Sequence, residues 1–175
     1  MQKEIFTTIA IMLFLAVIAI IIYAPGWNKQ SQQTGISTVI QNQNIPEPTG
    51  YVVDKADLID ENGEKFLTES IKSVVDHGKS EIAVLTIDSL NGLSIEEFGI
   101  RVAEKWKVGK YGVDDGVILI ISKKDRKVRI ELGRGSKITD AQAKDIINNK
   151  MIPKLKAEEW EDAILDGIGA LINLS

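Results

Sequence analysis

The strongest constraint on this chain is an uncharged apolar run from Ile5 to Ala24. At 1.5 Å of helix rise per residue, about twenty such residues are enough to cross the hydrocarbon of a bilayer. A buried core helix would not be apolar on every face, and the apolar part of a cleaved signal peptide is usually shorter. We therefore predict a transmembrane signal-anchor over residues 1–25, with a cleaved signal peptide as the alternative.

The flanks of this run bear on its orientation. Lys3 lies before it and Lys29 after it, so the positive-inside rule favours an inside N-terminus only slightly. The head before the run is very short, and Tyr23 and Trp27 stand where interfacial aromatic residues belong. We expect a single-pass protein of the cell membrane with its C-terminal domain outside the cytoplasm.

A polar stretch follows the apolar run. Residues 26–50 are rich in Gln, Asn, Ser and Thr and close with Pro46-Glu47-Pro48. Such a composition buries too little apolar surface to fold alone. It predicts a flexible linker that would hold a domain on the order of 25 Å from the bilayer.

Composition limits what the remaining residues, 51–175, can do. They are enough for one domain with one core. The whole chain has 21 Lys and Arg against 25 Asp and Glu, a net charge of −4. This acidic balance argues against nucleic acid as a partner, because such binding needs a basic surface. The chain has no cysteine, which excludes disulfides, zinc–thiolate sites and thiol nucleophiles.

Helix and strand patterns alternate along residues 51–175. Asp60, Ser94 and Thr139 are predicted helix caps, and the last two stand in capping boxes. Continuous apolar runs predict buried strands, and an alternating run predicts a half-exposed strand in a hairpin. The predicted strands are Glu81 to Ile87, Gly116 to Ser122 and Lys127 to Gly133. A strand, a capped helix and a second strand imply a parallel pair, so the prediction is an α/β domain with a mixed sheet.

Three segments resemble the TPM domain family. They are Tyr51 to Leu58 (YVVDKADL), Trp106 to Leu119 (WKVGKYGVDDGVIL) and Arg126 to Gly135 (RKVRIELGRG). The segments occur in the same order as in the family, and the resemblance covers essentially all of Tyr51 to Ser175. It implies an α/β/α sandwich, usually anchored by a membrane helix. It also implies one of several functions, because family members are described as acid phosphatases, as calcium or magnesium binders, and as assembly or repair factors of membrane complexes.

Carboxylates suggest a metal site. Asp114 and Asp115 precede a strand whose hairpin partner ends at Gly133, so this loop and Gly133 should share an edge of the sheet, with Asp140 close by. Asp54, which matches a family motif, joins them if its segment passes the same edge. Oxygen ligands suit Ca²⁺ or Mg²⁺. The alternative is structural: a turn at Asp115-Gly116 and a helix-dipole role for Asp140.

Basic residues suggest an anion site instead. Arg134 and Lys137 stand where the family often has an aromatic residue and an acid, and with the amides of the Thr139 helix they would hold a phosphate. A phosphatase, however, needs a nucleophile or a metal-activated water. The single histidine, His77, ends a helix and is expected to pair with its last carbonyls. Any hydrolysis would therefore be metal-assisted.

Arg129 and Glu131 alternate outward on the predicted hairpin. They are expected to form a solvated face or a cross-strand charge pair, or else the floor of a cleft.

These observations lead to one hypothesis and two alternatives. The leading hypothesis is a membrane-anchored accessory or assembly module that binds a divalent cation and another membrane protein. The first alternative is a metal-dependent phosphatase with Asp54, Asp115 and Asp140 at the metal and Arg134 near the phosphate. The second is an interaction domain without a metal.

Overall fold

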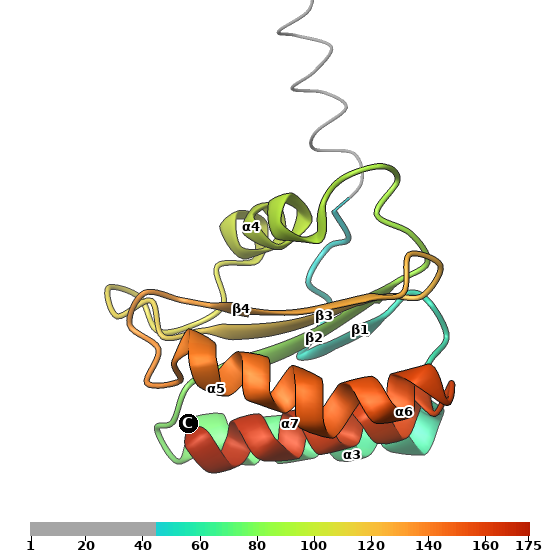
Figure 1. The fold of residues 1–175 in the computed structure, drawn as a ribbon. Helices are drawn as coiled ribbons and strands as arrows, with labels where there is room; N and C mark the ends of the chain where they lie inside the picture. The colour runs from blue at the N-terminus through green and yellow to red at the C-terminus, as the bar shows by residue number, and fades with distance from the viewer. Residues whose placement is uncertain (1–44) are drawn as a thin grey trace, which may run out of the picture. The chain divides into compact units, whose positions relative to one another are not determined.

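The computed structural model describes residues 45–175, which form a compact unit. The three predicted strands are present in the predicted order, and a further short strand precedes them (Figure 1). In chain order they are β1 (Val52–Asp54), α3 (Glu61–Asp76), β2 (Ile82–Ile87), α4 (Ile95–Trp106), β3 (Val117–Ser122), β4 (Lys127–Leu132), α5 (Asp140–Asp145), the π-helix η1 (Ile146–Met151), α6 (Ile152–Lys156) and α7 (Trp160–Leu174).

The four strands make one mixed sheet in the order β1-β2-β3-β4. β1, β2 and β3 are parallel, with Val52 opposite Val84 and Ile82 opposite Val117. β4 runs antiparallel to β3. Every residue of β2 and β3 is buried, as their continuous apolar runs require when helices cover both faces. The predicted α/β class and mixed sheet are confirmed.

The two faces of the sheet are covered unequally. Helix α4 lies alone on one face, and the other helices lie on the opposite face (Figure 1). Phe98, Val102 and Trp106 of α4 join one apolar cluster with the side chains of that sheet face. A larger cluster on the other face contains Leu67 of α3 and Ile164 of α7. A single helix does not cover a whole sheet face, which leaves room beside α4.

Three of the helices, α3, α4 and α5, begin at the predicted caps. The side chains of Asp60, Ser94 and Thr139 accept hydrogen bonds from the backbone N–H three residues on. Only Thr139 forms the full capping box, because the side chain of Gln142 returns the bond to the cap backbone. Local sequence therefore determines where these helices start.

Two segments depart from a simple reading of the sequence. The helix that starts at Thr139 continues through the π-helix η1 into α6, where Pro153 lies in the first turn. Proline, which has no N–H to donate, is common in the first turn of a helix. The compact unit also starts at Ile45, ahead of Tyr51, where the sequence places the domain boundary.

The residues before Tyr51 pack against helix α4. Ile45 is buried in the α4 cluster, and its carbonyl accepts a bond of 2.8 Å from Nζ of Lys105. The indole N–H of Trp106 donates to the carbonyl of Pro46 at 2.8 Å, and Lys105 forms an ion pair with Glu47 at 2.6 Å. The end of the predicted linker is thus part of the domain.

The predicted transmembrane segment, residues 1–25, lies outside the described residues, as does most of the predicted linker. Among residues 45–175, no helix is long and apolar enough to cross a bilayer.

Candidate functional site: a cleft beside helix α4

A cleft of about 630 Å³ opens beside α4, where this single helix leaves part of the sheet uncovered. One wall is the outer side of α4 with Ile100 and Lys107, and another is the loop with Tyr111 and Asp114. Glu131, Gly133 and Arg134, at the end of β4, complete the lining. The side chains of Ile100 and Tyr111 are exposed, at 51% and 106% of their reference areas. Exposed apolar and aromatic side chains around a hollow are typical of a binding surface.

An ion pair lies between β4 and α4 at the side of the cleft. Nε of Arg129 donates to Oε2 of Glu131 at 2.5 Å, and their side chains are 29% and 17% exposed. A Cβ atom added to Gly99 of α4 would lie 2.7 Å from that Oε2 atom. The glycine therefore provides the space for the pair. The pair lies within β4 and is not the cross-strand pair that was expected. Glu131 also lines the cleft, which agrees with the third expected arrangement.

The loop between α4 and β3 is held by Asp115. This residue is 7% exposed, and its Oδ1 accepts a bond from the backbone N–H of Lys110 at 2.9 Å. Nζ of Lys110 lies 3.7 Å from its Oδ2. Asp115 therefore closes a turn of six residues, 110 to 115, so its carboxylate has a structural role, although the turn precedes the predicted Asp115-Gly116 pair.

Asp114 joins this loop to the end of β4. Its Oδ2 accepts bonds from the backbone N–H of Arg134 at 3.3 Å and from Nε of the same residue at 3.2 Å. Its carbonyl accepts a bond from the N–H of Gly135 at 2.8 Å. The predicted proximity of the acidic loop to Gly133 and Arg134 is thus present. Arg134, 95% exposed, is already paired with a carboxylate.

The other predicted site residues lie apart from the cleft. Asp140 is the first residue of α5, exposed beside its cap, and Lys137 is exposed in the preceding turn. Neither lines the cleft. Asp140 occupies the position that the dipole alternative gives it.

Asp54 lies at the opposite end of the sheet. In the sheet register, Asp54 stands beside Thr86 of β2, and Thr86 stands beside Ile121 of β3. Ile121 is six residues after Asp115, so Asp54 and Asp115 are roughly 20 Å apart along the strand direction. Its Oδ2 accepts bonds from the N–H groups of Leu58 and Ile59 at 2.8 and 2.9 Å. Asp54 therefore organises the turn into α3, and the structure does not bring it together with the acidic loop.

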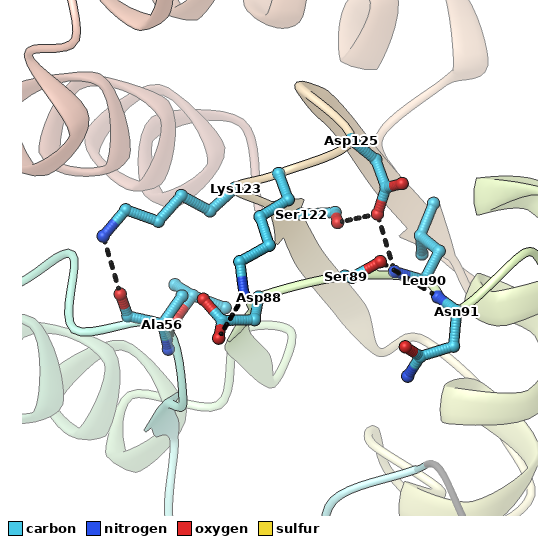
Figure 2. A network of polar contacts seen from close by, with 10 residues as sticks. Ala56, Asp88, Ser89, Leu90, Asn91, Ser122, Lys123 and Asp125 are labelled. Carbon is cyan, nitrogen blue, oxygen red and sulfur yellow. Dashed lines mark hydrogen bonds and ion pairs between the residues drawn. The ribbon is translucent and has the colours of Figure 1, made fainter.

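The sequence analysis did not single out a polar network at the carboxyl ends of the parallel strands (Figure 2). Oδ2 of Asp125 accepts bonds of 2.6 Å from Oγ of Ser122 and from the N–H of Leu90. These two donors lower the pKa of Asp125, the hydroxyl having the larger effect. Asp88 pairs with Lys124 at 3.0 Å. The rule that open α/β sheets bind ligands at their carboxyl ends could have identified this edge.

The described residues contain no group of three or more His, Cys, Asp or Glu side chains placed to hold a metal ion. The four predicted carboxylates are divided between two ends of the sheet, and three of them already serve turns or a helix start. They do not fit one divalent-cation site as a set. Nδ1 of His77 lies 2.6 Å from the carbonyl of Ser73 at the end of α3, which is the pairing expected for it.

Comparisons with known proteins agree with this fold. The family model described as the TPM domain matches residues 52–174. The chain resembles the solution structure of the N-terminal domain of a protein from P. gingivalis. The two are 26% identical and have a TM-score of 0.66, over 72% of this chain and 82% of that one. No curated protein matches the chain.

Two further solution structures share the fold at lower identity. An N-terminal domain from Corynebacterium glutamicum has 21% identity and a TM-score of 0.58, over 75% of this chain and 85% of that one. The protein BA42 from Bizionia argentinensis has 13% identity and a TM-score of 0.55, over 68% of this chain and 82% of that one. At these identities, the likeness concerns the fold alone.

Proposed function

Because this chain belongs to the TPM domain family, we propose that it is a membrane-anchored accessory module that binds another membrane protein outside the cytoplasm. The apolar run Ile5 to Ala24 supports the anchor. The cleft beside α4 supports the binding role, and the observation that carries it is the exposure of Ile100 and Tyr111 at its walls. Aromatic residues at such places are common anchors of protein interfaces.

The chemistry of the cleft favours binding over catalysis. Two of its three acidic lining residues, Asp114 and Glu131, each pair with an arginine. A side chain acting as nucleophile would need a base within hydrogen-bond reach. The lone histidine instead contacts the end of its own helix. The cleft thus offers apolar contact and fixed charge to a partner.

Site-specific crosslinking in cells tests this proposal. A photoreactive amino acid at position 111 should crosslink one membrane protein in stoichiometric amount. The same group at position 66, on α3, is the control, because Phe66 is also exposed, at 62%, but lies away from the cleft. Capture from both positions, or from neither, would contradict a partner site at the cleft.

A second variant reports on the same surface. Tyr111→Asp places a charge at the mouth of the cleft without removing any buried contact, since this side chain is fully exposed. We expect the affinity for the partner to fall at least about tenfold, which is the effect of removing one interface anchor. The midpoint of thermal unfolding should stay unchanged. The matched variant Phe66→Asp should retain the partner.

A divalent cation is the second candidate ligand. Asp114 is the residue that supports cation binding. Its carboxylate is half exposed, and it lines the same cleft as Glu104 and Glu131. With so few protein ligands, Ca²⁺ or Mg²⁺ would keep most of its waters and bind at about 10⁻⁴ to 10⁻³ M. Calorimetric titration of the full chain beside Asp114→Asn tests this, because the variant should remove the heat of binding.

The same samples test the phosphatase alternative. A phosphate ester is incubated with the chain and each cation. Metal-dependent turnover that Asp114→Asn abolishes would replace the accessory role with a hydrolytic one. Heat without turnover leaves a cation-binding module.

A further inference from the structure

Strand β4 is an edge of the described sheet, with β3 as its only neighbour there. The N–H of Gly133 bonds to the carbonyl of Gly116 at 2.8 Å, and Leu132 stands opposite Val117. Hydrogen-bonded pairs alternate in an antiparallel ladder. Residues 127, 129 and 131 therefore bond to β3, while the backbone groups of Val128, Ile130 and Leu132 point away from the sheet.

Nothing in the described part of the chain pairs with those outward groups. No backbone or side-chain hydrogen bond reaches the N–H or C=O of Val128, Ile130 or Leu132 from another element. The register with β3 runs residue for residue from Lys127 to Leu132, so no bulge distorts the edge, and the strand contains no proline. Such an edge can pair with another extended chain.

Charged side chains often protect an edge strand, but two of those on β4 are tied down. Arg129 and Glu131 pair with each other over Gly99, on the α4 face of the sheet. Their charges are therefore directed away from the line of free backbone groups. Only Lys127, at the start of the strand, is an exposed charge without such a pair among the described residues.

Two hollows flank the edge, one on each face of the sheet. The cleft lies on the α4 face at the end of β4, where Glu131 and Leu132 line it. A second hollow of about 320 Å³ lies at the start of β4, on the face covered by α6 and α7. Successive side chains of a strand point to opposite faces. An added strand would thus place one side chain toward each hollow, and three positions apart is the spacing from Val128, which lines the second hollow, to Glu131, which lines the cleft.

The two hollows differ in chemistry. The second hollow is lined by Arg126, Lys127 and Lys156 together with Trp160. Arg126 pairs with Glu158 at 3.1 Å, whereas within residues 45–175 the two lysines have no ion pair. An acidic side chain complements this hollow. The exposed Ile100 and Tyr111 of the cleft suit an apolar side chain.

We propose that β4 binds an extended segment of a partner protein by strand addition, with an apolar residue toward the cleft and an acidic residue toward the second hollow. This inference rests on the proposed function, and it specifies how the partner is recognised. Backbone bonds from Val128, Ile130 and Leu132 supply the pairing, and the two hollows supply the sequence preference.

Two synthetic peptides test the proposal. The capped peptides TETVLTV and TLTVETV carry the acid and the apolar residue three positions apart, in the two orders that parallel and antiparallel pairing require. Each is titrated to millimolar concentration into the labelled full chain in detergent micelles. With one of them, the amide signals of Val128, Ile130 and Leu132 should shift, and their hydrogen exchange should slow at least about tenfold. Shifts absent with both peptides, or confined to side chains of the cleft, overturn strand addition.

N-methylation of the bound peptide separates backbone pairing from side-chain docking. Amides of one alternate set face β4 and the other set faces solvent. Methylation of the first set should weaken binding at least about tenfold, and methylation of the second should have little effect. Equal effects of both sets would contradict the proposal.

Protein variants complete the test. Val128→Pro removes an outward N–H and none of the bonds to β3, so the fold should persist while peptide binding is lost. Lys156→Glu should reverse the preference toward TKTVLTV or TLTVKTV. Retained peptide binding in Val128→Pro would overturn the edge as the site. If the membrane partner of the crosslinking experiment still binds this variant, strand addition fails and the accessory function stands.

Discussion

The carboxylate of Asp54, the last residue of β1, accepts a hydrogen bond from the buried hydroxyl of Thr86 in β2. The same carboxylate accepts bonds from the N–H groups of Leu58 and Ile59. One side chain thus connects two strands to the turn before α3.

Replacement of Asp54 should destabilise the domain. Asp54→Ala leaves several backbone N–H groups without their charged acceptor, and we expect a loss of about 2–4 kcal/mol in the free energy of unfolding. Thr86→Val removes one hydroxyl and should cost about 1 kcal/mol. Urea unfolding of both variants measures the difference. A loss in Asp54→Ala no larger than that in Thr86→Val would contradict this assignment.

Gly99→Ala should alter the cleft while leaving the fold intact. The new methyl group meets the flexible ends of Glu131 and Arg129, so the ion pair has to move. The helix gains about 1 kcal/mol of propensity, which offsets the disturbance. We expect a stability change within about 1 kcal/mol, together with a shifted Nε–H signal of Arg129 in NMR spectra. An unchanged signal would show that the pair does not depend on this glycine.

Gly116→Ala should be far more damaging. A Cβ atom at Gly116 would collide with the backbone carbonyl of Val108, which cannot move as a side chain can. We expect a loss of more than about 3 kcal/mol. The control is Gly169→Ala in α7, where an added Cβ meets no atom within 4 Å. This variant should be more stable than the original chain by about 0.5–1 kcal/mol. Thermal unfolding of the pair distinguishes close packing from a general effect of glycine replacement.

Stability should depend on the charge of Glu64. Burial, followed by the negative charges of Asp54, Asp57 and Glu61, raises the pKa of Glu64 above its usual 4.5. The Glu64 carboxyl therefore binds its proton more tightly in the folded state than in the unfolded state. Its favourable contribution to the free energy of unfolding is present below pH 4.5 and is lost as the pH rises through the folded pKa. Glu64→Gln should stabilise by a few tenths of a kcal/mol at pH 7. The gain should vanish near pH 4, as measured by unfolding at both pH values.

The sequence predicts those parts of the fold that depend on local patterns. Apolar runs indicate β2 and β3, and the hydroxyl or carboxylate of Asp60, Ser94 and Thr139 indicates helix starts, because these signals lie within a few residues of their effect. Strand β1 was missed as a strand. Its three residues carry too short a pattern, and its pairing with β2 is a long-range contact. The π-helix was missed because its residues, Ile146–Met151, carry no local signal that distinguishes them from an α-helix.

The candidate site could be predicted only in part. A hairpin register brings Asp114 to Arg134, and that proximity follows from the sequence. The position of Asp54 at the far end depends on the direction of β1, which the sequence analysis left open. The cleft itself could not be predicted, because it arises from the number of helices on each face and from the place where α4 ends.

The contacts of Ile45 and Pro46 with α4 also have a mechanical consequence. Lys105 and Trp106 hold the carbonyls of these two residues, several positions before β1 begins. A pulling force applied through the preceding chain therefore loads α4 before it loads the sheet. Such a force would peel Ile45 from its apolar cluster while β1 stays paired with β2. The contacts of Ile45 and Pro46 with α4 are therefore expected to break before the strands of the sheet separate.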